Sequence, residues 1–314
     1  MISNVSSARE FTFGYNLTLR AADTPARIWV PIPSSDRYQN IIERSFEFSR
    51  SGRVQLSTHG GNRILFIEVP LSNTDQKVAL SFQVSRLQRL NDLPPRDPYP
   101  ASLAEMGVAQ FLAADSRVPT DGAFGEEARA IVQGKHLPVD KARAVFEHIL
   151  QTYAYDSSGC TPEKGDALGD LQVACDLKLG TCTELHGLLV AYLRAAGVPA
   201  RFAFGFNVPP RARGQIAGYH CWAEAYLPHS GWFPIDVSEA RKRAAGAERD
   251  FYFGNLDENR VQFSVGRDVV LSPAQSSGPV DKFIFPHVEV EDRVVTPELS
   301  FSFEDAEQPV ARAG

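Results

Sequence analysis

The chain has 314 residues, enough for about two domains of ordinary size, and 43% of them are hydrophobic, which predicts a substantial core. The formal net charge is −6 at pH 7, and the scattered lysines and arginines exclude the basic surface that nucleic-acid binding needs. No apolar stretch approaches the roughly 18 residues of a membrane span, and residues 1–10 lack the pattern of a secretory signal. We expect a cytoplasmic protein, or a periplasmic or secreted one if a signal peptide was removed.

Residues 11–90 consist of short alternating apolar runs separated by Pro, Gly, Asn and Asp. The alternation is clearest at residues 26–30 and 64–69. This pattern predicts an N-terminal β-sandwich-like domain over residues 1–95. Four prolines between residues 91 and 100 oppose both helix and central strand, so we place the domain boundary there.

Apolar residues with helical spacing follow this boundary, at residues 102–114, 125–132 and 139–152. From residue 200 to residue 270 short strands dominate, and strand-like pieces return at residues 282–290. We therefore predict a second domain over residues 96–275 that opens with helices and continues with strands. Residues 276–314 are predicted to be a C-terminal extension with short strands.

The four cysteines lie within a window of 62 residues, too few for a disulfide scaffold in a chain of this size. No CxxC or HxxxH pair is present, so we expect no metal site. Cys160 and Cys175 flank a loop rich in Gly and Asp. They could form a disulfide in an oxidising compartment, although separate structural roles are the simpler interpretation.

Cys182 lies at the start of a predicted helix that ends before Gly197 and Pro199. The buried stripe of this helix comprises Leu185, Leu188, Leu189, Tyr192, Leu193 and Ala196. The first turn of a helix lowers the pKa of a thiol and offers backbone N–H groups to a developing oxyanion. The sequence therefore predicts a nucleophilic thiol, with a packed structural cysteine as the alternative.

Two later strands supply partners for this thiol. Residues 218–227 alternate, with His220 on the polar and aromatic face and Cys221 on the apolar face. A turn then leads to a second strand that ends at Asp236, so the hairpin can place Asp236 beside His220. A carboxylate there would fix the imidazole tautomer and stabilise the imidazolium that forms when Cys182 loses its proton. The alternative for Asp236 is a simple cap at the strand end.

His186 competes with His220 as the base, because it lies one helical turn after Cys182 on the same face. A general base must approach to about 3 Å. The only acid at a suitable spacing from His186 is Glu184, which faces elsewhere on the helix. We therefore favour His220 and expect a packing role for His186.

Three segments together resemble the transglutaminase-like superfamily, a papain-related group that includes tissue transglutaminases, peptide N-glycanases and many bacterial proteins. They are Gly-Thr-Cys at 180–182, His-Cys-Trp-Ala-Glu at 220–224 and Gly-Trp-Phe-Pro-Ile-Asp at 231–236. The resemblance covers about residues 140–239, and the sequence up to residue 268 looks like the continuation in the bacterial members. It implies an α+β, papain-like catalytic domain with Cys182, His220 and Asp236 as its triad.

The chain also departs from the family pattern. Val237 stands where many members have proline, which alters the turn after Asp236. Animal transglutaminases use a tryptophan upstream of the cysteine to help form the oxyanion pocket, and no tryptophan lies between Trp29 and Cys182. Calcium is not expected, because no loop has the EF-hand spacing. The substrate-binding or oxyanion candidates are Tyr155, Gln172, Thr181 and Trp222.

These residues predict a cysteine-dependent hydrolase, without a cofactor, that acts on a peptide, a protein or a small amide through a thioester on Cys182. A transglutaminase or amide ligase, which passes the acyl group to an amine, begins with the same step. A non-catalytic binding module of the same fold is the third hypothesis. The sequence does not choose between water and amine, because that choice depends on what the cleft admits.

Overall fold

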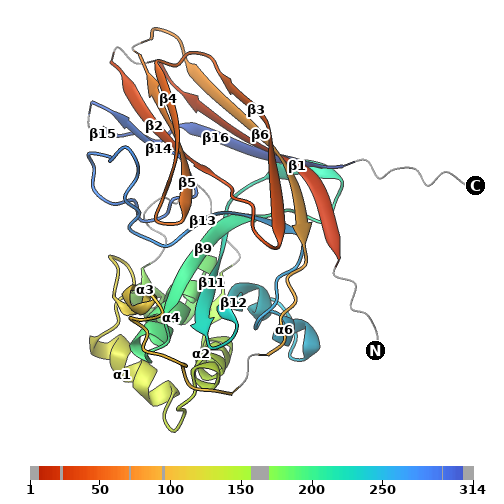
Figure 1. Cartoon of the computed structure of the whole chain (residues 1–314), viewed down its shortest axis with the longest axis vertical. Coiled ribbons are helices and arrows are strands. Elements are labelled where there is room, and N and C mark those ends of the chain that lie inside the picture. The colour runs from red at the N-terminus through yellow and green to blue at the C-terminus, as the bar shows by residue number, and fades with distance from the viewer. Residues whose placement is uncertain are drawn as a thin grey trace, which may run out of the picture.

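The structure is a computed structural model that describes residues 7–21, 24–70, 72–93, 96–156, 170–291 and 293–306. Figure 1 shows two large sheets in the upper part of the molecule and a smaller sheet with helices in the lower part. The protein is therefore α+β, with an N-terminal sheet region ahead of the core domain, as the sequence predicts. None of the described helices combines the length and the apolar composition that a membrane crossing requires.

The first large sheet is antiparallel and has five strands. In spatial order they are β10 (Arg213–Ile216), β16 (Glu298–Asp305), β1 (Ala8–Leu19), β6 (Gln76–Leu87) and β3 (Gln39–Phe48). Alternate residues of β1 and β6 are buried, including Phe13 and Phe82, while their neighbours face outward. This alternation of period two is what makes one face of the sheet a core face.

The second large sheet packs against the buried face of the first. Its order is β15 (Arg293–Val294), β14 (His287–Val290), β2 (Ala26–Ile32), β5 (Asn62–Val69) and β4 (Arg53–His59). Both faces of β2 are covered: Ile28 joins the core between the sheets, and Trp29 packs with Phe66 and Phe283 on the other side. Burial on both faces explains why β2 and β5 are nearly continuous apolar runs.

The C-terminal strands are part of this sandwich. β16 pairs with β1 from Phe11↔Asp305 to Thr18↔Glu298, and β14 pairs with β2. The segment predicted as an extension over residues 276–314 thus contributes β14, β15 and β16 to the two large sheets. Strands from the two ends of the described chain lie side by side.

The core sheet has the order β12 (Gly231–Ile235), β11 (His220–Leu227), β9 (Ala200–Asn207) and β13 (Arg260–Val265), with every neighbour antiparallel. β9 and β13 approach closely at an irregularity in their register. A Cβ atom on Gly205 would lie 2.0 Å from the carbonyl oxygen of Val261, so only glycine fits there.

Helices pack around one central helix, α4 (Cys182–Ala195), which lies against β11 (Figure 1). The others are α1 (Gly122–Ile131), α2 (Pro138–Thr152), α3 (Leu171–Leu177), α5 (Val237–Arg241) and α6 (Ala247–Phe251). A short parallel pair, β7 (Ala154–Tyr155) and β8 (Leu179–Gly180), precedes α4. α4 is buried over almost its whole length, because helices and sheet cover all its sides.

The helices predicted at residues 125–132 and 139–152 are confirmed as α1 and α2. The helix predicted over residues 102–114 is wrong, since this segment forms turns and one 3₁₀ helix, η1 (Ala109–Leu112). Gly107 lies in its middle with φ of 69°, a conformation that interrupts an α-helix. The predicted strand region from residue 200 to residue 270 is likewise interrupted, by α5 and α6.

Candidate active site

Cys182 is the first residue of α4 and is 2% exposed. Thr181 is the N-cap, and its hydroxyl accepts a hydrogen bond from the Thr183 amide at 3.3 Å. The Glu184 carboxylate accepts from the Thr181 amide at 2.7 Å, which completes a capping box. The capping box fixes the helix start at the cysteine, so the predicted position of Cys182 at the positive end of the helix dipole is confirmed.

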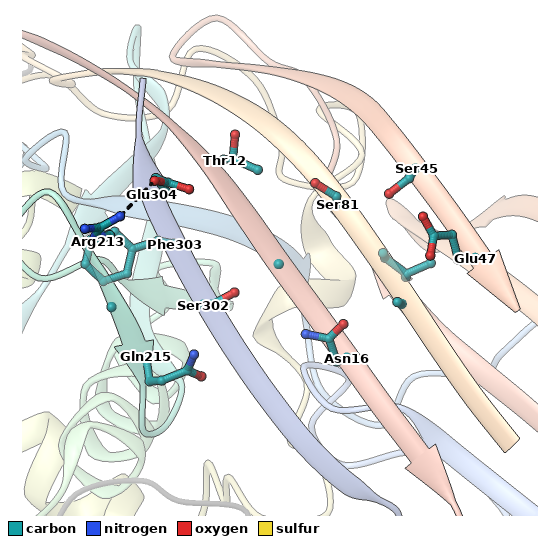
Figure 2. A pocket seen from close by; sticks show the side chains of 14 residues that line it. Thr12, Asn16, Ser45, Glu47, Ser81, Arg213, Gln215, Ser302, Phe303 and Glu304 are labelled. Carbon is teal, nitrogen blue, oxygen red and sulfur yellow. Dashed lines mark ion pairs between the residues drawn. The ribbon is translucent and has the colours of Figure 1, made fainter. Parts of the chain in front are cut away.

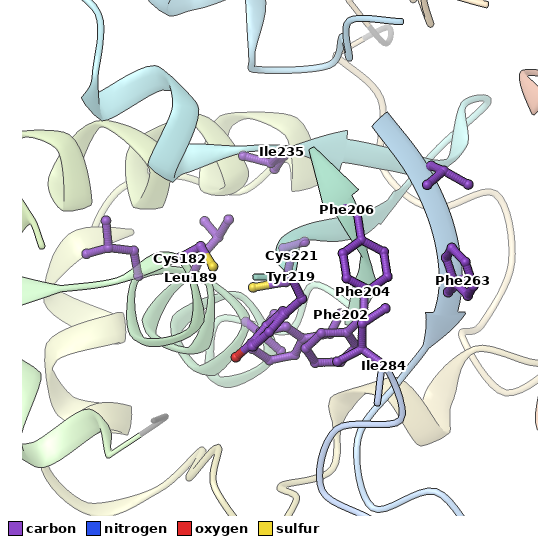
Figure 3. Packing of buried hydrophobic residues seen from close by; sticks show 14 of the residues in the cluster. Cys182, Leu189, Phe202, Phe204, Phe206, Tyr219, Cys221, Ile235, Phe263 and Ile284 are labelled. Carbon is purple, nitrogen blue, oxygen red and sulfur yellow. The ribbon is translucent and has the colours of Figure 1, made fainter. Parts of the chain in front are cut away.

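The start of β11 lies against the first turn of α4. The Tyr219 and Thr183 hydroxyls are 2.5 Å apart, which joins the residue before His220 to the residue after Cys182. Figure 3 shows Cys182, Tyr219 and Cys221 in the layer between α4 and the core sheet. Cys221 belongs to the buried apolar cluster, as the alternation of β11 predicts.

His220 and Asp236 meet across the β11–β12 hairpin. Nε2 of His220 lies 2.8 Å from Oδ2 of Asp236, and both side chains are buried. The antiparallel register, which pairs Ala223 with Ile235, brings the start of β11 to the end of β12. Nε2–H therefore donates to the carboxylate, and Nδ1 is the ring nitrogen left for a thiol.

Asp236 contacts His220 and also caps a helix, where the sequence suggested a strand-end cap as the alternative. Its Oδ1 accepts from the Glu239 amide at 3.0 Å and from the Ser238 hydroxyl at 3.1 Å, so it is the N-cap of α5. Its Oδ2 contacts His220. One carboxylate thus starts a helix with one oxygen and orients an imidazole with the other.

Arg260, which the sequence reasoning missed, is the second group on this carboxylate. Its Nη1 donates to Oδ2 of Asp236 at 2.8 Å and its Nη2 to Oδ2 of Asp257 at 2.7 Å. Burial alone would raise the pKa of the Asp236 carboxyl, but the charges of His220 and Arg260 hold that pKa well below its usual range. The sequence signal was an arginine opening an otherwise buried strand, three residues after an aspartate.

His186 is fully buried, and both its ring nitrogens contact backbone atoms. Nδ1 donates to the carbonyl oxygen of Cys182 at 2.7 Å, and Nε2 accepts from the Val237 amide at 3.1 Å. A neutral imidazole with its proton on Nδ1 satisfies both contacts. His186 thus joins the start of α4 to the start of α5, which fits a packing role.

The four oxyanion or substrate-binding candidates lie in different surroundings. Tyr155 pairs with Gly180 in the short β7–β8 ladder, which places its backbone beside the nucleophile loop. Thr181 donates its hydroxyl to Glu184 within the capping box. Gln172 is exposed on α3, and its amide donates to Asp176.

Trp222, the fourth candidate, is fully buried in a small cluster with Ala203 and Leu256. Its ring lies 5.1 Å from the Arg260 guanidinium carbon. This tryptophan therefore packs beneath the candidate triad, on the polar face of β11.

The possible Cys160–Cys175 disulfide cannot be followed, because Cys160 lies outside the described residues. Cys175 is half-buried, with its sulfur 3.4 Å from the Tyr153 hydroxyl. Within the described ranges, no group of three or more His, Cys, Asp and Glu side chains is arranged to hold a metal ion.

A polar hollow of about 530 Å³ lies on the outer face of the first large sheet, and Figure 2 shows its lining. Hydroxyl groups of Thr12, Ser81 and Ser302 and an ion pair between Arg213 and Glu304 surround it. Its lining includes neither a thiol nor an imidazole. The candidate thiol and imidazole therefore lie at the core sheet and α4, away from the lining of this hollow.

Several known proteins resemble this chain in part or over most of its length. Residues 126–237, which include Cys182, His220 and Asp236, match the family model described as the transglutaminase-like superfamily. An uncharacterized protein of Haemophilus influenzae is 26% identical over 322 residues, covering 90% of this chain and 85% of that protein. A protein-glutamine gamma-glutamyltransferase of Pseudomonas aeruginosa is 26% identical over 117 residues, covering 35% of this chain and 18% of that enzyme.

A solved structure shares the whole fold. A candidate cysteine protease from Cytophaga hutchinsonii matches with a TM-score of 0.61 and 16% sequence identity, covering 95% of this chain and 99% of that one. The likeness therefore includes the sandwich as well as the core sheet. Residues 126–237 therefore match the model of a transglutaminase-like core domain, and the solved structure has a similar fold.

Proposed function

We propose that the protein is a cysteine-dependent acyl-transfer enzyme that hydrolyses a peptide or other amide bond through a thioester on Cys182. The observation that carries this proposal is the buried hydrogen bond of 2.8 Å between His220 and Asp236, next to the first turn of α4. The rings of His186 and His220 are 6.3 Å apart, and His186 contacts the Cys182 carbonyl, so His220 lies close to this turn.

In the proposed mechanism, Nδ1 of His220 takes the proton of the Cys182 thiol, while Nε2–H remains on Asp236. The thiolate attacks the amide carbonyl carbon, a C–S bond forms, and the oxygen becomes negative. His220 then gives its proton to the amine nitrogen as the C–N bond breaks. Water adds to the thioester and gives a proton to Nδ1, the C–S bond breaks, and Nδ1 returns this proton to the leaving sulfur. The products are an amine, a carboxylic acid and the free thiol.

The N-terminus of α4 supports this chemistry through its dipole, which favours both the thiolate and the negative oxygen of the intermediate. Among the side-chain candidates, Tyr155 has the most direct positional support, because its backbone pairs with Gly180, two residues before Cys182. We therefore favour Tyr155 over Gln172 as the additional donor.

Transfer to an amine is the second candidate function. The similarity to the Pseudomonas aeruginosa protein-glutamine gamma-glutamyltransferase, 26% identical over 117 residues, supports it. The first half of the reaction is the same. An amine replaces water in the attack on the thioester and gives one proton to His220. The C–S bond breaks as the new amide forms, and His220 returns the proton to the leaving sulfur.

Site-resolved alkylation tests whether Cys182 is activated. At pH near 6.5, iodoacetamide should modify Cys182 at least about tenfold faster than Cys175, because a thiolate reacts and a neutral thiol does not. His220→Ala should remove this difference, and mass spectrometry of tryptic peptides measures both rates. Equal, slow labelling of the two cysteines in the unmodified protein would overturn the proposal and favour a binding module.

A casein assay separates the two reactions. Fluorescein-labelled casein is incubated with the protein, with and without monodansylcadaverine. Hydrolysis releases small labelled peptides in both samples, whereas transfer adds the dansyl amine to casein. Cys182→Ala should abolish either signal, and Cys175→Ala is the matched control. Full turnover in Cys182→Ala would show that another residue is the nucleophile.

A further inference from the structure

We propose that Arg260 is a positioning residue of the candidate triad, which shares the Asp236 carboxylate with His220 and keeps it ionised throughout the catalytic cycle. This role presupposes the proposed function of Cys182 and His220. It concerns a residue that touches neither the thiol nor, in the proposed mechanism, the substrate. Arg260 acts through Asp236 on the imidazole.

The geometry places two donors on a single oxygen. Nε2 of His220 and Nη1 of Arg260 each lie 2.8 Å from Oδ2 of Asp236. Among the residues that the structure describes, these are the two whose donors contact Oδ2. The ion pair is sealed from water, since the side chains of Arg260 and Asp236 are both 0% exposed.

Arg260 is itself held from several directions. Its Nη2 donates to Asp257 at 2.7 Å, and its guanidinium carbon lies 5.1 Å from the Trp222 ring. It is the first residue of β13 and pairs with Asn207 of β9. The planar guanidinium of Arg260, fixed by these contacts, holds its positive charge next to one carboxylate oxygen. The flexible ammonium group of a lysine would be less well positioned.

The permanent positive charge of Arg260 favours the ionised form of Asp236. Burial favours the neutral form of Asp236, and His220 is positively charged during only part of the proposed cycle. When His220 is neutral, Arg260 is the partner on Oδ2 that still carries a positive charge, because a guanidinium does not lose its proton in proteins. Asp236 can therefore keep Nε2–H of His220 in place in both protonation states.

Sharing also affects how readily His220 gives up its proton. A carboxylate that already faces a cation attracts an imidazolium less strongly than an unshared carboxylate would. The proton on Nδ1 is then released more easily to the leaving amine, which is what a general acid requires near neutral pH.

Several titratable or charged groups either contact the His220–Asp236 pair or lie near the residues that contact it. They are Cys182 and His186 of α4, Cys221 of β11, Glu239 of α5, Asp257 before β13, Arg260 of β13, Arg86 of β6 and Tyr252 after α6. A titration of His220 must therefore be compared between variants that change one of these contacts at a time.

The test variant is the double substitution Arg260→Met with Asp257→Asn. It removes the cation together with its second carboxylate, so the formal net charge is unchanged and the partly buried Asp257 is not left without its arginine. The matched control is Arg267→Met with Asp281→Asn. Arg267 is equally buried, donates to Asp281 at 2.7 Å and lies 5.1 Å from a ring, that of Phe202.

The readout is the NMR titration of the His220 ring in a Cys182→Ala background, assigned with His220→Gln, so that the thiol does not contribute. Without Arg260, the buried His220–Asp236 pair holds its proton to higher pH, whichever of the two groups carries it, so the midpoint sensed by the ring should move upward by about one pH unit. The control should not move it. Arg260→Lys keeps the positive charge but lacks the planar guanidinium, and it should move the midpoint by less than half as much.

An unchanged midpoint in a folded Arg260→Met/Asp257→Asn protein would overturn the proposal and leave Arg260 as a packing residue. An equal movement in the control would also overturn it, because the effect would then be general. In proteins that retain Cys182, the alkaline inflection of the iodoacetamide rate should follow the NMR midpoint. If Cys182 proves unreactive while the midpoint moves, the proposed function fails and the coupling between Arg260 and Asp236 stands.

Discussion

In the β-sandwich, Glu289 is a carboxylate buried for structural reasons. It accepts hydrogen bonds from the backbone amides of Ser276 and Ser277 at 2.8 and 2.9 Å, and it forms an ion pair with Arg27. Burial alone would raise the pKa of Glu289, but these backbone bonds and the neighbouring His287 lower it to about 2. This carboxylate joins the loop at residues 276–277 to strand β14 by hydrogen bonds.

In the core domain, Asp236 is buried just as completely, and its pKa is also lowered. Its donors differ in kind, because one of its oxygens faces an imidazole and a guanidinium instead of backbone amides. A lowered carboxyl pKa therefore shows that a buried carboxylate has hydrogen-bond donors or cations beside it. It does not by itself identify a catalytic site. The imidazole next to the N-terminus of α4 is what makes Asp236 a candidate for chemistry.

The largest expected effect that separates the two regions comes from Asp236→Asn compared with Glu289→Gln. Asp236→Asn should slow Cys182-dependent turnover by about 10²–10⁴-fold, because an amide does not hold the required imidazole tautomer. It should also lower the free energy of unfolding by about 3–5 kcal/mol, since it leaves Arg260 with one fewer anion. Glu289→Gln should cost about 1.5–3 kcal/mol and leave alkylation of Cys182 unchanged. Urea unfolding and site-resolved alkylation measure the two effects, and slower alkylation in Glu289→Gln would contradict the separation.

Acid stability gives a smaller effect. Because the pKa of Glu289 is lower in the folded protein than the roughly 4.3 of the unfolded chain, its contribution is fully present above that value and is lost as the pH falls toward about 2. Between pH 6 and pH 3 the unmodified protein should therefore lose about 2 kcal/mol more unfolding free energy than Glu289→Gln. Urea unfolding at the two pH values measures this difference. Equal losses would mean that Glu289 has no special partners.

Helix caps give the smallest expected effect. Thr181→Ala removes the cap of α4 and Asp170→Ala removes the cap of α3, where Asp170 accepts from the Gln172 and Val173 amides. Each should cost about 1 kcal/mol. Only Thr181→Ala should also slow alkylation of Cys182, by up to about fivefold, because the helix dipole at the thiol weakens when the first turn frays. Equal alkylation rates in the two variants would show that the dipole is unimportant.

Much of the candidate site could be predicted locally. The start of α4 at Cys182 follows from a capping residue and an apolar stripe, and the capping-box pattern of Thr181 and Glu184 was available in the sequence to sharpen it. The meeting of His220 with Asp236 follows from strand alternation and one short turn, because a hairpin fixes its own register. Neither step needs information from distant parts of the chain.

Contacts between segments far apart in the sequence were not predictable in this way. Arg260 reaches Asp236 from 24 residues away, across a sheet whose strand order is not the chain order. The bridge that His186 makes between the Cys182 carbonyl and the Val237 amide spans 51 residues on its longer side. A buried arginine or histidine at an ordinary position in a helix or strand has no sequence pattern that names its partner.

The sequence by itself determined the helix start at Cys182, the hairpin that pairs an imidazole with a carboxylate, and the α+β class, because each depends on residue types at short and regular spacings. The tertiary structure alone decided that the C-terminal strands join the N-terminal sheets and that Asp236 faces a guanidinium as well as an imidazole. The physical reason is that strand order and burial arise from packing the whole chain, and only packing sets which charge lies beside which.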